Sequence, residues 1–192
     1  MPIDKRKNWI IIILELISII FIMGVLFYFK NLKNDSFVAK EIANFQECIE
    51  AGNPAMENYP RQCRDRKGNK TFTENIGNEP EKIDLIRLNT PRPNQEISSP
   101  LVIEGEARGI WYFEGDFPII LTDWDGKIIA EGYATAKGEW MDEGFVPFKG
   151  ELVFENPTYS NHGSLILKKD NPSDLPEHDD ALEIPILFKE ID

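Results

Sequence analysis

The 192-residue sequence lacks the motifs on which common enzymes rely, and it has only two histidines. No serine lies in a G-x-S-x-G or S-x-x-K pattern, no H-E-x-x-H pair occurs, and no glycine-rich phosphate loop is present. Nucleophilic catalysis needs a Ser, Cys or Thr beside a base, and His162 and His178 both lie in polar turns outside any such motif. We therefore expect no enzymatic activity and no cofactor.

Basic residues are also scarce. The chain has 21 Lys and Arg against 33 Asp and Glu, and its formal net charge is −12. Nearly all of the acidic residues follow Ser36, and that part of the chain carries about −14 on the same count. Nucleic-acid backbones attract an excess of Lys and Arg, so a nucleic-acid partner is excluded.

Cysteine is limited to Cys48 and Cys63. A metal site would need further ligands nearby, and a redox pair is normally spaced C-x-x-C, so a structural disulfide is favoured. Closing a loop of about 15 residues stabilises a small module by about 3 kcal/mol. Residues 36–74 should form this module, opening with a helix over residues 37–51 that Ser36 caps.

Long apolar runs are missing after residue 29 but not before it. Residues 9–29 form one apolar run, interrupted by Glu15 and Ser18, that spans about 31 Å as a helix and matches a bilayer core. No small-x-small cleavage site follows, so an uncleaved signal anchor is favoured over a signal peptide. Lys5, Arg6 and Lys7 indicate that residues 1–8 are a cytoplasmic tail. We expect a single-pass cell-membrane protein whose C-terminal part is extracytoplasmic.

After a polar linker at residues 75–82, residues 83–192 show short apolar runs separated by turn formers. The runs predict seven strands, at residues 83–88, 101–107, 117–124, 127–136, 148–154, 164–169 and 183–190. Asp125-Gly126 predicts a hairpin, and Pro91, Pro93 and Pro100 should restrict the opening strand to an edge or split it. The predicted fold is mainly β, an immunoglobulin-like β-sandwich preceded by a transmembrane helix and a small disulfide-stapled helical module.

Four segments of this region, SSPLVIEGEA, FEGDF, DWDGK and NPSDLPEHDD, occur in an order that resembles the Gmad2 family, the bacterial spore germination immunoglobulin-like domain. The resemblance covers nearly all of residues 83–190. It implies an immunoglobulin-like sandwich at the cell surface or envelope, and it supplies no catalytic residues. Because no cysteine lies in residues 83–192, packing alone must hold this domain.

Two tryptophans are the candidate contact residues. Trp124 lies beside the predicted hairpin tip, where it is hard to bury, and Trp140 is the second choice, although either side chain could pack on a neighbouring strand. We expect no metal site. The weak candidates for calcium ligands are Asp123, Asp125, Asp179 and Asp180, whose loops lack EF-hand spacing.

Together these features predict a membrane-anchored extracytoplasmic protein that binds or scaffolds. Its partners would be the membrane, through residues 9–29, and an envelope protein or a cell-wall glycan. The main alternative is an inhibitor or regulator of an envelope hydrolase or protease that acts through the loop between Cys48 and Cys63. An envelope hydrolase is a further alternative, which a convergent cleft of carboxylates with raised pKa would favour.

Overall fold

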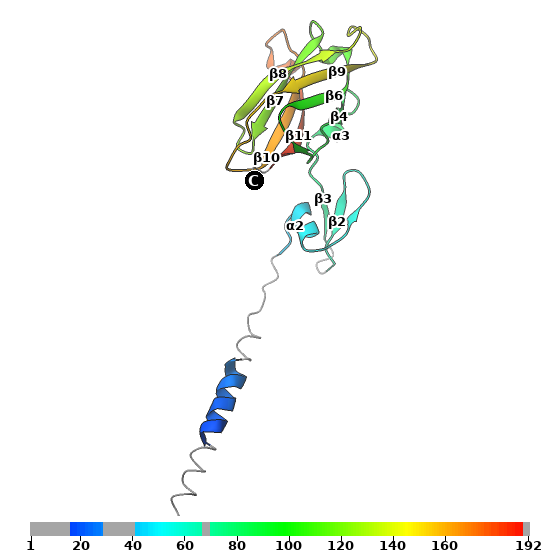
Figure 1. The fold of residues 1–192 in the computed structure, drawn as a ribbon. Helices are drawn as coiled ribbons and strands as arrows, with labels where there is room; N and C mark the ends of the chain where they lie inside the picture. The colour runs from blue at the N-terminus through cyan, green and yellow to red at the C-terminus, as the bar shows by residue number, and fades with distance from the viewer. Residues whose placement is uncertain (1–15, 29–40, 67–69, 190–192) are drawn as a thin grey trace, which may run out of the picture. The chain divides into compact units, whose positions relative to one another are not determined.

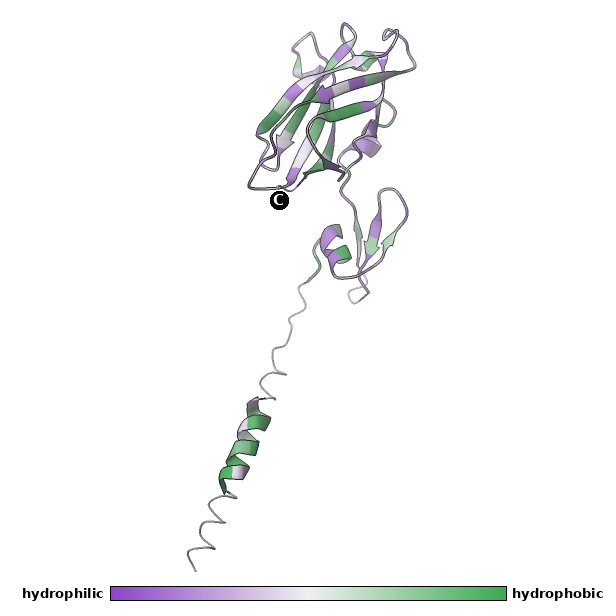
Figure 2. Ribbon diagram, viewed as in Figure 1, coloured by the Kyte–Doolittle hydropathy of each residue, from purple (hydrophilic) through white to green (hydrophobic). Residues whose placement is uncertain are grey.

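A computed structural model describes residues 16–28, 41–66 and 70–189 (Figure 1). The chain divides into two compact units, Met1–Ile42 and Ala43–Asp192. In the first unit, residues 16–28 form a helix that is mostly hydrophobic (Figure 2). The large apolar side chains of this helix are exposed. Glu15 and the remainder of the predicted 9–29 span lie outside the described residues.

Among the described residues, no helix has both the length and the apolar character needed to cross a membrane.

The second unit begins with a small module built around a disulfide. It contains α2 (Phe45–Glu50) and an antiparallel sheet in the order β1 (Ala55–Met56), β2 (Gln62–Arg64) and β3 (Thr71–Thr73). The predicted bond between Cys48 and Cys63 is confirmed, with both residues fully buried and their Cα atoms 6.1 Å apart. The disulfide thus joins α2 to β2.

The helix of this module is shorter than predicted. It begins at Phe45, residues 41–44 are not helical, and residues 36–40 lie outside the described part of the chain. Asn44 has extended backbone angles, and its side chain accepts a hydrogen bond of 2.9 Å from the Glu47 amide, while the Glu47 carboxylate accepts one from the Ala43 amide. This reciprocal cap starts α2 at Phe45, so the predicted continuous helix over residues 37–51 is wrong.

An ion pair between the exposed Arg61 and the buried Glu74 closes the end of the module, and Asn94 links Glu74 to the segment that precedes β5. Glu74, which follows β3, accepts two hydrogen bonds from the Arg61 guanidinium, of 2.8 and 2.5 Å, and one from the Asn94 amide group. These charge-assisted hydrogen bonds, led by that from Arg61, lower the pKa of Glu74 against the opposing effect of its burial. The carboxylate therefore stays ionised in the folded protein at neutral pH.

The expected linker at residues 75–82 contains ordered structure. Ile76 is buried, and α3 (Glu79–Lys82) follows it. The buried Glu79 carboxylate pairs with Arg92 at 2.8 Å and accepts a hydrogen bond from the Tyr59 hydroxyl. Polar composition alone did not reveal these contacts, because their partners lie elsewhere in the sequence.

The rest of the unit is one curled sheet (Figure 1). It has eight strands, in the order β4-β6-β9-β8-β7-β10-β11-β5. The strands are β4 (Ile86–Thr90), β5 (Glu96–Ile97), β6 (Leu101–Arg108), β7 (Asp116–Asp123), β8 (Ile128–Ala136), β9 (Phe145–Leu152), β10 (His162–Lys168) and β11 (Ala181–Phe188). Two 3-10 turns are also present, η1 (Gly109–Trp111) and η2 (Pro176–His178). Neighbouring strands are antiparallel, except that β5 pairs with β11 in parallel.

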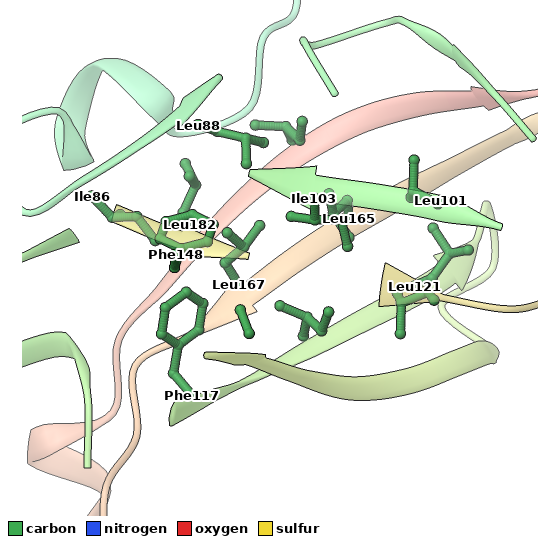
Figure 3. Packing of buried hydrophobic residues seen from close by; sticks show 14 of the residues in the cluster. Ile86, Leu88, Leu101, Ile103, Phe117, Leu121, Phe148, Leu165, Leu167 and Leu182 are labelled. Carbon is green, nitrogen blue, oxygen red and sulfur yellow. The ribbon is translucent and has the colours of Figure 1, made fainter. Parts of the chain in front are cut away.

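The mainly β prediction is confirmed. Strand alternation places one face of each strand in a single core, as in β6, where every second residue from Leu101 to Ala107 is buried. Phe117 and Phe148 pack edge to face within this core, with ring centroids 5.0 Å apart (Figure 3).

The proline prediction is also confirmed. Pro91 and Pro93 separate β4 from β5, and the two halves of the opening segment occupy the two opposite edges of the sheet. Proline has no amide hydrogen to donate to a strand ladder, so the segment leaves one edge and joins the other.

Candidate binding surface

The direction of β7 defines two ends of the sheet. β7 starts at Asp116, after the connection from β6, and finishes at Asp123, before the hairpin turn to β8. Eight residues of strand cover roughly 25 Å, so the two ends are far apart. Trp124 lies at the end where β7 finishes.

The hairpin turn is held by the Asp123 side chain. Its Oδ1 accepts hydrogen bonds from the backbone amides of Asp125 and Lys127, at 3.0 and 2.9 Å. Gly126 has φ of +81°, which fits the glycine of the predicted Asp125-Gly126 hairpin. Asp123 is buried, whereas Trp124 lies in the turn itself and is 63 % exposed.

The connection between β9 and β10 is fixed beside this turn. The register of β7 against β10 pairs Asp123 with Gly163, and the Tyr159 hydroxyl donates a hydrogen bond to Oδ2 of Asp123. That hydrogen bond lowers the pKa of Asp123 and raises the pKa of Tyr159. The aromatic ring of Tyr159 remains exposed next to the hairpin.

A groove opens between β8 and the chain that leaves β9. The two strands pair only over Ala134–Ala136 and Phe148–Gly150, so they diverge toward the Trp124 end. The groove has a volume of about 530 Å³, and its lining is mostly apolar. The residues that line it are Lys127, Ile128, Ile129, Val153, Phe154 and Glu155.

We call Trp124, Ile128, Val153 and Tyr159 the Trp124 surface. All four side chains are more than half exposed, and Val153 reaches 74 %. Lys127 and Glu155 supply one charge of each sign beside the groove. Such an arrangement can bury apolar area against a partner while its polar rim sets the orientation, and it offers no group arranged for covalent chemistry.

The second predicted contact residue does not join this surface. Trp140 lies in the connection between β8 and β9, where a side chain on Gly115 would stand 3.3 Å from the Trp140 indole. Gly115 precedes β7, so Trp140 belongs to the opposite end of the sheet, and it is partly buried against the core. The structure therefore separates the two tryptophans.

The weak metal candidates are not gathered into a site. Asp179 accepts a hydrogen bond from Asn171, and Asp180 pairs with Lys82 at 2.5 Å. Asp123 serves the hairpin, and Asp125 lies in the turn that Asp123 braces. Within the described ranges, no group of three or more His, Cys, Asp or Glu side chains could hold a metal ion.

Sequence reasoning identified Trp124 but missed the other three members of its surface. Ile128 was assigned to a strand, and Val153 to the strand before the β9–β10 connection, without regard to exposure. Tyr159 offered a usable signal, since it is the one aromatic residue in the polar segment 155–161. Val153 offered none, because its exposure depends on how β8 and β9 separate.

The loop between the cysteines is partly engaged within the protein. Ala55 and Met56 pair with Cys63 and Gln62, and the Tyr59 hydroxyl donates to Glu79 and accepts a hydrogen bond from Arg92. Met56 and the Tyr59 ring are exposed.

The comparison with family models supports the sequence resemblance. No curated protein and no solved structure matches the chain significantly. The family model described as the immunoglobulin-like domain of bacterial spore germination matches residues 85–175, which run from just before β4 into the β10–β11 connection. Residues 85–175 therefore belong to the immunoglobulin-like domain family of bacterial spore germination, Gmad2.

Proposed function

We propose that this protein is a membrane-tethered binding or scaffolding component of the cell envelope, and that it engages its partner through the Trp124 surface. The family match suggests a binding or scaffolding role. The observation that carries the proposal is an apolar groove lined by the exposed Ile128 and Val153, at the same end of the sheet as the exposed Trp124. A soluble domain gains nothing by exposing such side chains together, whereas an interface does.

The tether is inferred from sequence and local structure. Residues 9–29 are long and apolar enough to span a bilayer, and the described portion, residues 16–28, is helical with exposed Leu, Ile, Phe and Met side chains. The disulfide between Cys48 and Cys63 fits an oxidising compartment outside the cytoplasm.

Protease treatment of intact cells tests the tether. We expect added protease to remove residues 43–192 from whole cells while a cytoplasmic marker stays intact. A thiol reagent should label the native protein only after reduction. Survival of the domain in whole cells, with cleavage after lysis, would contradict the proposed location.

Capture by the full-length protein in a non-ionic detergent tests the binding surface. Solubilised envelope proteins and purified cell-wall glycan are offered separately, so that the class of partner is read directly. Trp124→Ala should weaken capture about tenfold or more, as the loss of an aromatic anchor does. Tyr133→Ala is the matched control, because Tyr133 is equally exposed in the middle of β8. Equal capture by the wild type and Trp124→Ala would refute the role of this surface.

A further inference from the structure

The opposite end of the sheet carries a second exposed surface with a different character. It is formed by three connections, residues 109–115 between β6 and β7, 137–144 between β8 and β9, and 169–180 between β10 and β11. We call them the three-loop end. We propose that the three-loop end binds a cationic polypeptide segment with interspersed apolar residues, independently of the Trp124 surface.

The three connections are held together by hydrogen bonds and by a close backbone approach. The Arg108 guanidinium donates to the Glu143 carbonyl at 2.9 Å, and the Asp170 amide donates to the Trp111 carbonyl at 3.1 Å. Gly109 lies so close to residues 140–142 that an added Cβ would stand 2.4 Å from the Asp142 carbonyl oxygen. The loops therefore form one preorganised platform, which lowers the entropic cost of binding.

Each connection exposes at least one large apolar side chain. Ile110 follows Gly109, and Met141 lies between the two carbonyls that approach Gly109, so their backbones are neighbours. Ile110 is 64 % exposed and Met141 is 71 % exposed. Leu175, in the third connection, and Phe113 are exposed as well. Exposed apolar side chains on rigid neighbouring loops mark an interaction site more strongly than scattered ones do.

The charge around these side chains specifies the partner. The three connections contain nine carboxylates and two lysines, a formal net charge of −7. The carboxylates are Glu114, Glu139, Asp142, Glu143, Asp170, Asp174, Glu177, Asp179 and Asp180. At the Trp124 end, the turn 124–127 and the connection 153–161 together carry only −1. A complementary partner must therefore bring several positive charges to this end.

A polypeptide fits this surface better than other cationic or charged ligands. Within the part of the chain that the structure describes, no cluster of three potential metal ligands is present, and an ion would leave Ile110 and Met141 without a contact. Phosphate-bearing ligands are repelled by the carboxylates. A segment that alternates Lys or Arg with apolar residues satisfies both the charge and the exposed apolar area.

A labelled synthetic peptide of alternating Lys and Leu is the probe. Its binding to the full-length protein in non-ionic detergent is followed by fluorescence anisotropy, with empty micelles subtracted. The same peptide with acetylated lysines should bind at least about tenfold more weakly, because the charge attraction is lost. Equal binding of the two peptides would overturn the proposal.

Charge variants locate the site. Glu143→Gln with Glu177→Gln should weaken binding of the Lys-Leu peptide about fivefold and reduce its salt dependence. Glu131→Gln with Glu151→Gln removes the same charge from exposed strand positions and should change affinity less than about twofold. If the two double variants lost the same affinity for the peptide, the attraction would be a general one to an acidic protein, and the proposal would fail.

Apolar variants separate this site from the Trp124 surface. Ile110→Ser with Met141→Ser should weaken peptide binding about tenfold, since both side chains are exposed and their loss leaves the core intact. Trp124→Ser should leave peptide binding unchanged. Thermal unfolding of each variant confirms that it is folded. The proposal is overturned if Trp124→Ser weakens peptide binding, or if the double variant Ile110→Ser with Met141→Ser does not, because the peptide then binds elsewhere.

Discussion

Substituting Gly77 with alanine should detach the segment that leads into the curled sheet. Gly77 has φ of +72°, and an added Cβ would lie 1.9 Å from the Glu183 carbonyl oxygen on β11. Backbone on both sides of the contact leaves no flexible side chain to move aside. The segment must shift by more than an ångström, or β11 must.

The magnitude follows from the contacts that this shift breaks. The backbone amide of Asn78 donates a hydrogen bond to the Glu183 carbonyl at 3.1 Å. The Asn78 side chain accepts one from the Glu183 backbone amide at 2.8 Å and donates one to the Ala181 carbonyl at 2.9 Å. At about 1 kcal/mol for each hydrogen bond, their loss costs about 3 kcal/mol. The left-handed backbone adds about 1 kcal/mol for alanine. We expect Gly77→Ala to lower the unfolding free energy by about 4 kcal/mol.

Thermal unfolding and hydrogen exchange measure this effect. A loss of that size lowers the melting temperature by about 10 °C in a unit of this length. The amide protons of Asn78 and Glu183 should lose protection first. Gly126→Ala is the control, because Gly126 also has positive φ but no heavy atom lies within 4 Å of its added Cβ, so about 1 kcal/mol is expected. If the two variants were equally stable, the reasoning from the Glu183 contact would be refuted.

Three further predictions concern the two parts of the second unit. Replacing both Cys48 and Cys63 with alanine should destabilise the small module by about 3 kcal/mol, seen as local loss of hydrogen-exchange protection, while the curled sheet keeps its own protection. The lowered pKa of Glu74 means that its carboxylate is protonated at lower pH in the folded state than in the unfolded state. The contribution of ionised Glu74 to the unfolding free energy is therefore fully present above the unfolded pKa of about 4.5 and is lost as the pH falls through the folded pKa. The unfolding free energy of Glu74→Gln, measured across acid pH, should depend less on pH than that of the wild type. Equal pH dependence of the two proteins would contradict this prediction. Phe117→Ala should cost about 3 to 5 kcal/mol in chemical denaturation because Phe117 is fully buried against Phe148, and a loss below about 1 kcal/mol would contradict that packing.

The strands were predictable because their signal is local. The residue pattern along β6 and β11 predicts their alternating burial, and Asp125-Gly126 predicts the hairpin. The strand predicted at residues 148–154 begins earlier, at Phe145, and includes Pro147. Its pairing with β8 starts only at Phe148, so Pro147 lies where β8 has ended.

The sites were less predictable because they depend on contacts between distant segments. The exposure of Trp124 follows from its place beside a tight turn. Tyr159 joins it only because β10 pairs with β7, and Ile110 meets Met141 only through the approach of Gly109 to residues 140–142. Such neighbours leave no periodic trace in a single sequence.

The split opening segment ties the two margins of the β-structure to each other. β4 and β5 are separated by a few residues, yet they cover opposite borders of the eight-stranded array. Release of this one short stretch would uncover the flanks of β6 and β11 together, and both would then be open to pairing with other chains. Protection against aggregation therefore depends on a single segment, next to the point where the polypeptide enters the domain.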